Sequence, residues 1–194
     1  MENIFGLEKK LVDQLKLLKE EFNLQSIKAE FETEGSSFRD LVRLRRITGK
    51  LGVALYLKIG GVEAVRDIKD SLEAGVDGLV APMVESRFGL KKFFDAVDSI
   101  YKNKDIHLSI NIETQQAVAN LDSILELGVE GNLDNVTVGR TDLSQSYFDP
   151  MIQPDSLFIF DLIENLSFKT QASRLTLTIG GSVKKRVFTY FSNE

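Results

Sequence analysis

Apolar residues recur at intervals of three and four along several stretches of the chain, with Lys, Asp and Glu between them. In residues 6–22 the apolar set is Leu11, Leu15, Leu18 and Phe22, a spacing that forms one stripe along the side of a helix. The same reasoning, with glycine as a stop signal after several segments, predicts helices over 6–22, 36–48, 62–74, 88–101, 117–127 and 157–168.

Short, mostly apolar runs alternate with these helices, and they predict strands over 26–32, 53–59, 78–82, 107–112, 135–138, 175–179 and 187–191. Strands that alternate with helices of this length indicate βα units and a parallel sheet. Because the runs are mostly apolar, we expect them to be apolar on both faces, with helices on one side and a barrel interior on the other.

This order of elements predicts an α/β fold of the (β/α)8 TIM-barrel type in one domain over residues 1–194, with an additional N-terminal helix. The seven expected strands are one fewer than a closed barrel needs. After Gly180-Gly181 the chain holds one expected strand and no helix before it. We therefore expect a barrel that is incomplete, or shortened by about one βα unit.

Composition narrows the class of protein. Apolar residues make up 43% of the chain and charged residues 27%, as in ordinary globular proteins. The net charge of −5 argues against nucleic acid or an anionic membrane as a partner, and the absence of cysteine excludes disulfides, thiolate zinc sites and cysteine nucleophiles. No apolar run is long enough to span a bilayer, and no signal peptide is evident at Met1–Phe5. We expect a cytoplasmic location.

Two acidic residues follow apolar runs at the ends of expected strands. Glu113 follows His107–Ile112, and Asp142 lies in the segment Val138–Ser144. Carboxylates at neighbouring strand ends can face one cavity and hold a hard divalent cation such as Mg²⁺. Taken singly, each also fits helix capping, since Asp142 can cap a turn through Ser144–Tyr147.

Other candidates lie at the same end of the expected sheet, where barrel sites are found. Lys58 fits either a site cation or an ordinary lysine paired with Glu30 or Glu32. One of the glutamates at the end of the expected strand over 26–32 is expected to reach the site. Gly60 and Gly61 fit an anion-binding turn as well as a tight βα turn.

Three further residues complete the candidate set. Glu85 fits a solvated turn residue better than a hydrogen-bonding partner of the site. Arg140 is a candidate cation. His107, the single histidine, begins its strand and should face the opposite end of the barrel, in a structural role.

Six segments in order along the chain carry a resemblance to a known family: Lys28–Glu32, Leu57–Asp67, Ala81–Ser86, Ile110–Thr114, Val138–Ser144 and Thr178–Gly181. Together they resemble the HpcH/HpaI aldolase and citrate lyase family, a group of phosphoenolpyruvate/pyruvate-binding barrels. The most specific element is the pair Ile-Glu-Thr and Gly-Arg-Thr-Asp-Leu-Ser.

The resemblance implies a divalent-metal-dependent carbon–carbon lyase or aldolase that acts through an enolate on a small oxo-acid or acyl-CoA-type substrate. It implies that Glu113 and Asp142 ligate Mg²⁺ or Mn²⁺. Lys58, where many relatives carry arginine, and Arg140 become the candidate catalytic cations. The substrate-binding candidates are Glu30, Gly60, Gly61 and Glu85.

The chain also departs from the family pattern. The aldolase branch uses a histidine-based dyad, which His107 is not placed to supply, and relatives continue with a longer loop and helix after the Thr-Ile-Gly-Gly segment. The alternative is therefore a catalytically impaired, shortened relative that binds a small anionic ligand or a partner protein. The resemblance also allows a homo-oligomer.

Overall fold

The computed structural model describes residues 4–102 and 105–184. Its strands are β1 (Ser26–Glu30), β2 (Ala54–Lys58), β3 (Gly78–Ala81), β4 (His107–Ile112), β5 (Asn135–Gly139) and β6 (Thr176–Gly180). Its helices are α1 (Ile4–Phe22), α2 (Phe38–Leu51), α3 (Val65–Ala74), α4 (Arg87–Tyr101), α5 (Gln115–Ala119), α6 (Leu121–Glu130), α7 (Arg140–Gln145) and α8 (Leu157–Ala172). Among the described residues, no helix is both long enough and apolar enough to cross a membrane.

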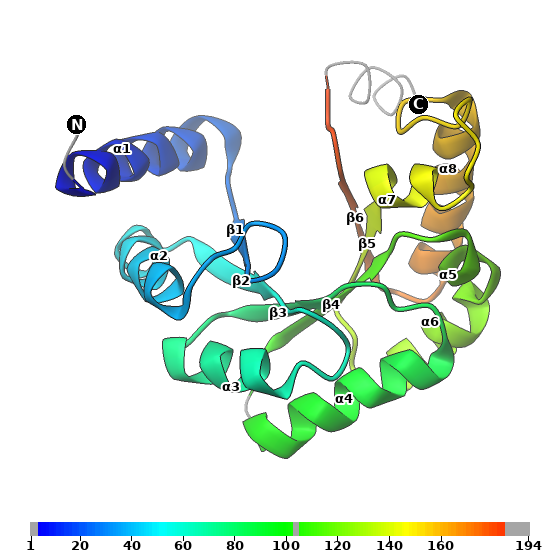
Figure 1. The fold of residues 1–194 in the computed structure, drawn as a ribbon, viewed down its shortest axis with the longest axis horizontal. Helices are drawn as coiled ribbons and strands as arrows, with labels where there is room; N and C mark the ends of the chain where they lie inside the picture. Colours follow the sequence, from blue (N-terminus) through cyan, green and yellow to red (C-terminus); the bar gives the residue numbers. More distant parts are fainter. Residues whose placement is uncertain (1–3, 103–104, 185–194) are drawn as a thin grey trace.

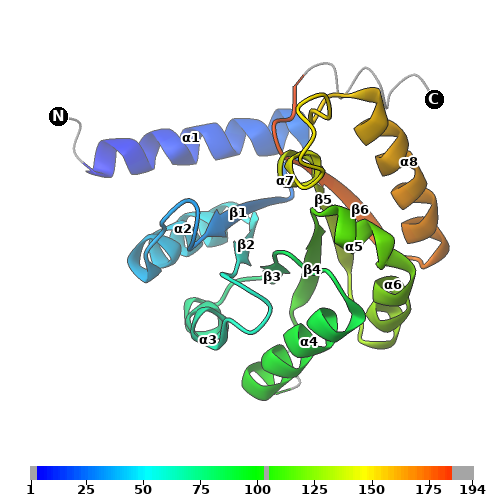
Figure 2. The same ribbon diagram turned by 45° about the vertical axis from the view of Figure 1, so that its right-hand side comes forward.

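The strands form one six-stranded parallel sheet in the order of the sequence, from β1 to β6. The sheet curls, and helices α2–α6 and α8 lie along its outer side (Figures 1 and 2). Its inner side lines a hollow, because residues of every strand border one cavity there. This arrangement is a half-barrel, a partial form of the predicted (β/α)8 barrel. The predicted strand over 187–191 lies outside the described residues, so barrel closure stays untested.

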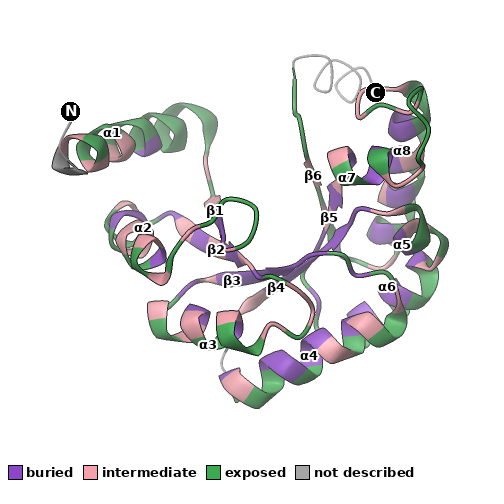
Figure 3. Cartoon of the chain, in the orientation of Figure 1, coloured by how far each residue is buried: buried purple, intermediate pink, exposed green. Residues whose placement is uncertain are grey.

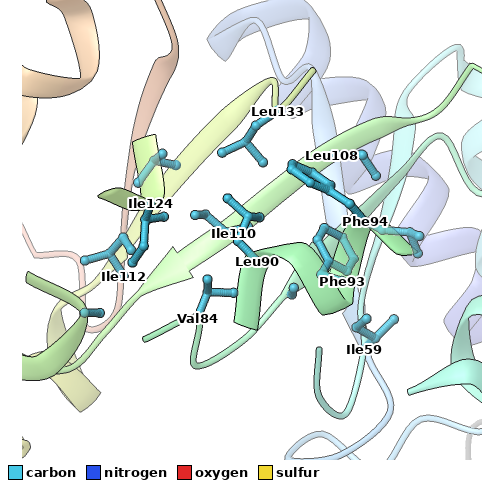
Figure 4. Close-up of a cluster of buried hydrophobic side chains, with 14 of the residues drawn as sticks. Ile59, Val84, Leu90, Phe93, Phe94, Leu108, Ile110, Ile112, Ile124 and Leu133 are labelled. Atoms are coloured by element: carbon cyan, nitrogen blue, oxygen red, sulfur yellow. The ribbon is translucent and has the colours of Figure 1, made fainter. Parts of the chain in front are cut away.

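The apolar core lies between the sheet and its outer helices (Figure 3). Alternate strand residues such as Leu57, Leu79 and Ile110 are fully buried in this core. Ile110 lies beside the helix residues Leu90 and Phe93 (Figure 4). Each large apolar side chain buried in this way contributes about 1.5–3 kcal/mol, which fixes the strands against the helices.

The inner face of the sheet is polar, contrary to the expectation of strands that are apolar on both faces. In β4, Ser109 and Asn111 face the hollow between the outward-facing Leu108, Ile110 and Ile112. The carboxamide of Asn135 joins three strands, because it donates to Ser109 at 2.8 Å and accepts from Thr176 and Thr178 at 2.9 Å each. The alternation is that of a sheet with one dry face and one wet face.

Several boundaries differ from the predictions. The first strand ends at Glu30 rather than residue 32, because the chain turns there and the Ser36 amide bonds back to the Glu30 carbonyl at 3.2 Å. The expected helix 117–127 is two helices, α5 and α6, which meet at Asn120. Helix α7, which follows β5 directly, was not predicted.

Candidate active site

The hollow side of the sheet holds a cavity of about 690 Å³ that is lined by residues of all six strands. At the carboxyl ends of the strands it is bordered by Glu30, Lys58, Glu113, Asp142 and Gly181. The structure therefore brings together four of the predicted site residues, Glu30, Lys58, Glu113 and Asp142, at the edge of the sheet where barrel enzymes carry their sites.

Glu113 follows β4 and is held from two sides. Its Oε1 accepts a hydrogen bond from the backbone amide of Met83 at 3.0 Å, and its Oε2 accepts one from Asn111 Nδ2 at 3.1 Å. The next residue, Thr114, caps α5 through its side chain, which fixes the backbone of the strand end. Only 2% of Glu113 is exposed, and this burial raises the pKa of its carboxyl despite the hydrogen bonds.

Asp142 lies in the first turn of α7 and is exposed at the cavity edge. Its negative charge contributes to the raised pKa of Glu113, so the two carboxylates lie within electrostatic reach of each other. Gly139 makes room between β5 and Glu113, because a Cβ atom there would lie 2.6 Å from Glu113 Oε2. Two carboxylates that border one cavity and repel each other are suited to a shared cation.

Lys58 borders the same cavity from the end of β2, two strands before β4, and the side of the cavity with Glu113 and Asp142 is called the acidic wall here. Its ammonium donates to Glu30 Oε1 at 2.9 Å. Burial disfavours the charge on Lys58, but the hydrogen bond to Glu30 and the charges of Glu113 and Asp142 outweigh burial and raise the pKa of Lys58. Lys58 is therefore a stable cation that faces the acidic wall.

Arg140, the second predicted cation, is committed elsewhere. Its side chain is fully buried, and it donates to the Pro154 carbonyl and to Asp155 Oδ1, each at 2.9 Å, and to the Gly181 carbonyl. It therefore ties α7 to the loop before α8 and to the end of β6. Its catalytic role stays a prediction, and these contacts favour a structural one.

The remaining predicted residues lie away from the cavity wall. The Gly60 amide donates to Asp67 Oδ2 at 2.7 Å, and the Gly61 carbonyl accepts from the Ala64 amide at 3.1 Å, which is the pattern of a tight βα turn. The Glu85 side chain is exposed, and its carbonyl accepts from Asn120 Nδ2 at 2.7 Å. None of the three borders the cavity.

His107 lies at the amino end of β4, as expected. Its ring stacks on that of Tyr56 with 4.9 Å between centroids, and its Nδ1 is 3.6 Å from Asp134 Oδ2. It borders the cavity at the end opposite Glu113. These contacts of His107 lie at the end of β4 away from Glu113, and they fit a structural role.

Among the residues near the carboxylates that the sequence did not indicate are Asn111, Thr141 and Met83. Asn111 and Thr141 border the cavity, and Met83 supplies an amide to Glu113. The polar residues at alternate positions 107, 109, 111 and 113 are a readable signal for Asn111. Met83 gives no such signal, because it acts through its backbone, which adopts a left-handed φ of 52°.

A family model describes this part of the chain. The model of the HpcH/HpaI aldolase/citrate lyase family matches residues 41–148, which is more than half of the sequence. The chain belongs to this family. The matched segment includes Lys58, Glu113 and Asp142, so these site residues lie within the part of the chain that the family model describes. A comparison with curated proteins found no match.

Solved structures share the fold at low identity. An HpcH/HpaI aldolase from Desulfitobacterium hafniense DCB-2 is 18% identical, with a TM-score of 0.75 and with 93% of this chain and 77% of that chain covered. Citrate synthase SbnG is 19% identical, with a TM-score of 0.71 and with 94% and 78% covered. An HpcH/HpaI aldolase/citrate lyase family protein from Burkholderia cenocepacia J2315 is 12% identical, with a TM-score of 0.74 and coverage of 94% and 80%. These likenesses establish the fold.

The carboxylates fit a divalent metal of the Mg²⁺ type. Residues 4–102 and 105–184 bring together no group of three or more His, Asp or Glu side chains that could hold a metal. Mg²⁺ needs no such group, since it keeps several waters and binds proteins through one or two carboxylates together with the substrate. The fixed orientation of Glu113 and its repulsion with Asp142 suit that mode of binding.

Proposed function

We propose that this protein is a divalent-metal-dependent carbon–carbon lyase or aldolase that acts on a small oxo acid through an enolate. The observation that supports the proposal is the convergence of Glu113, Asp142 and Lys58 on one cavity in a member of the HpcH/HpaI family. Family membership supports lyase or aldolase chemistry, and the arrangement of charges supports a cation on one wall and an anionic substrate between the walls.

In this proposal Glu113 and Asp142 hold Mg²⁺ or Mn²⁺. When bound, the metal supplies Lewis acidity toward the oxygen atoms of the substrate. Lys58 places a second positive charge across the cavity, where it stabilises negative charge that develops on the substrate oxygen. Its raised pKa keeps it an ammonium, so it acts as a cation rather than as a nucleophilic amine.

The substrate binds between the two walls. Apart from the charged groups, the cavity is lined by hydroxyl and amide side chains such as Ser109, Asn111, Thr137 and Thr178, which suit a small polar molecule. A carboxylate of that molecule finds its complement in Lys58 and the metal. An acyl-CoA-type substrate is the alternative, with its acyl end in the same place and its carrier outside.

Exchange of the methyl protons of pyruvate in D₂O tests the proposal without knowledge of the aldehyde partner, because exchange reports enolate formation. We expect Mg²⁺- or Mn²⁺-dependent loss of the methyl signal in ¹H NMR. Glu113→Gln and Asp142→Asn should abolish it and weaken Mn²⁺ binding measured by electron paramagnetic resonance. Glu73→Gln, which removes an exposed carboxylate on α3, should do neither. Mn²⁺ binding that survives both site substitutions contradicts the metal assignment.

One observation favours a second candidate function. The chain's one histidine stacks on Tyr56 at the amino end of the sheet, so the carboxylate end lacks a histidine base. A non-catalytic relative would bind a small anion and metal without turning the ligand over. It would bind oxalate with Mn²⁺ in calorimetry yet show no pyruvate exchange, whereas metal-dependent exchange lost in Asp142→Asn eliminates this candidate.

A further inference from the structure

Glu30 and Lys58 are direct partners in the parallel register of β1 and β2. Their ion pair is 2.9 Å long, and the two side chains are 6% and 16% exposed, respectively. Lys28, two residues earlier on β1, donates to the other Glu30 oxygen at 3.2 Å. Both oxygens of Glu30 thus face lysines of the same wall, although Glu30 was predicted to bind substrate.

Lys58 is also attracted to the charges of the acidic wall. The charges of Glu113 and Asp142 act on it strongly enough to help raise its pKa. Lysine carries a compact charge on a flexible four-carbon stem, and it lacks the rigid fork that holds an arginine in one orientation. Within the described residues its ion pair is nevertheless with Glu30 alone.

We propose that Glu30 is a positioning residue, whose carboxylate holds the Lys58 ammonium on the β1–β2 wall and keeps it from pairing with Glu113 and Asp142. Without Glu30, the lysine extends to the acidic wall and occupies the place of the divalent cation. Glu30 thereby keeps two binding functions apart: Glu113 and Asp142 remain available to the metal, and Lys58 remains available to the substrate.

This inference rests on the proposed function, because the metal at Glu113 and Asp142 is part of that proposal. The contacts between Glu30 and Lys58 are present in the protein without any metal. The carboxylate of Glu30 is suited to the task because it stays ionised: although burial opposes the charge, hydrogen bonds from Lys58, Thr33 and Lys28 lower its pKa to about 2. Glu30 therefore remains a negative anchor for Lys58 across the range of neutral and mildly acidic pH.

The test is a double-mutant cycle read by Mn²⁺ affinity in electron paramagnetic resonance, on the full chain. Glu30→Gln should weaken Mn²⁺ binding about tenfold, as loss of a supporting residue of a metal site does. In the Lys58→Met background, where no ammonium can move, the same substitution should change the affinity by no more than about twofold. Glu32→Gln, an exposed glutamate two residues further along, is the matched control and should leave the affinity unchanged.

Equal weakening by Glu30→Gln in both backgrounds overturns the inference, because the effect would then not pass through Lys58. An unchanged Mn²⁺ affinity when Glu30→Gln is made in the parent protein, with Lys58 in place, overturns it as well. If Glu30→Gln does not fold, Glu30→Asp keeps the charge but withdraws it from the lysine, and the same comparison is made with that variant.

A second readout separates this inference from the proposed function. NMR of the lysine side chains, without metal, should show a Lys58 ammonium signal protected from exchange in the parent protein and shifted in Glu30→Gln, where the ammonium pairs with Glu113 and Asp142 instead. If the parent protein binds no Mn²⁺, the proposed metal function fails, and this signal still decides the role of Glu30. A Lys58 signal that is the same in both proteins refutes the positioning role.

Discussion

The backbone amide of Met83 donates a hydrogen bond of 3.0 Å to Oε1 of Glu113, and so joins the loop after β3 to the end of β4. Met83 makes this bond from a left-handed conformation with a φ of 52°. Such a backbone costs a residue with a side chain about 1–2 kcal/mol. The site therefore contains local backbone strain at Met83, and the amide held in this conformation orients the carboxylate of Glu113.

Substitution of Met83 separates the strain from the hydrogen bond. Met83→Gly relieves the strain and keeps the amide, so we expect stability within about 1 kcal/mol of the parent and unchanged Mn²⁺ affinity. Met83→Pro removes the amide and cannot adopt a positive φ, so we expect a loss of about 2–3 kcal/mol and weaker Mn²⁺ binding. Urea unfolding and Mn²⁺ titration measure both. Equal Mn²⁺ affinity in the two variants contradicts a role for the amide.

Gly139 is predicted to be intolerant of any side chain. A Cβ there would lie 2.6 Å from Glu113 Oε2 and 3.0 Å from Glu113 Cβ, so Gly139→Ala should displace the carboxylate. We expect Mn²⁺ affinity to fall and stability to drop by about 1–3 kcal/mol, as overpacking does. Gly49→Ala on α2, where nothing lies within 4 Å of the new Cβ, is the matched control and should stabilise by about 0.5–1 kcal/mol.

The order of elements and the two site carboxylates were predictable, because both depend on local patterns. The helical spacing and the glycine stops indicate βα units, and Glu113 follows its apolar run directly. The long-range contacts were not predictable in the same way. The pair of Lys58 with Glu30, 28 positions apart, was predicted only as one alternative beside Glu32 and a site cation. No local pattern indicates that Arg140 contacts Gly181, 41 positions away.

The polar inner face is a different case, since its signal was present in the sequence. His107, Ser109 and Asn111 alternate with Leu108, Ile110 and Ile112, which is the pattern of a sheet with one wet face. The expectation of a barrel interior led to the prediction of two apolar faces. The half-barrel instead lines an open hollow with hydrogen-bonded side chains, as in the contacts of Asn135.

The metal-free protein should show opposite pH effects from its two buried glutamates. The pKa of Glu113 is raised by burial, so the folded protein binds this proton more tightly than the unfolded chain. Stability from this group is lost as pH rises from the ordinary glutamate pKa of 4.5 through its folded pKa. The pKa of Glu30 is lowered to about 2, so its contribution is present above 4.5 and lost as pH falls toward 2.

Urea unfolding without metal, from pH 3 to pH 8, measures both effects. Glu113→Gln should gain stability relative to the parent as pH rises above about 5, because a neutral amide avoids the buried charge. Glu30→Gln should lower the free energy of unfolding by about 2 kcal/mol near neutral pH, and this difference from the parent should shrink as the pH falls. A Glu113→Gln variant whose stability difference from the parent does not vary with pH refutes the assigned shift.

Substitution of Arg140 tests whether this residue has a catalytic or a structural role. Its fully buried guanidinium donates to Asp155, Pro154 and Gly181, so Arg140→Met should leave Asp155 and two carbonyls without their donor. We expect a loss of about 2–3 kcal/mol, because the hydrogen bonds of a charged, buried donor are removed. Lys58→Met, at a partly exposed site, should cost less stability yet weaken oxalate binding measured by calorimetry with Mn²⁺. If Arg140→Met instead keeps the parent's stability and loses oxalate binding, the arginine is a site cation and the structural assignment is wrong.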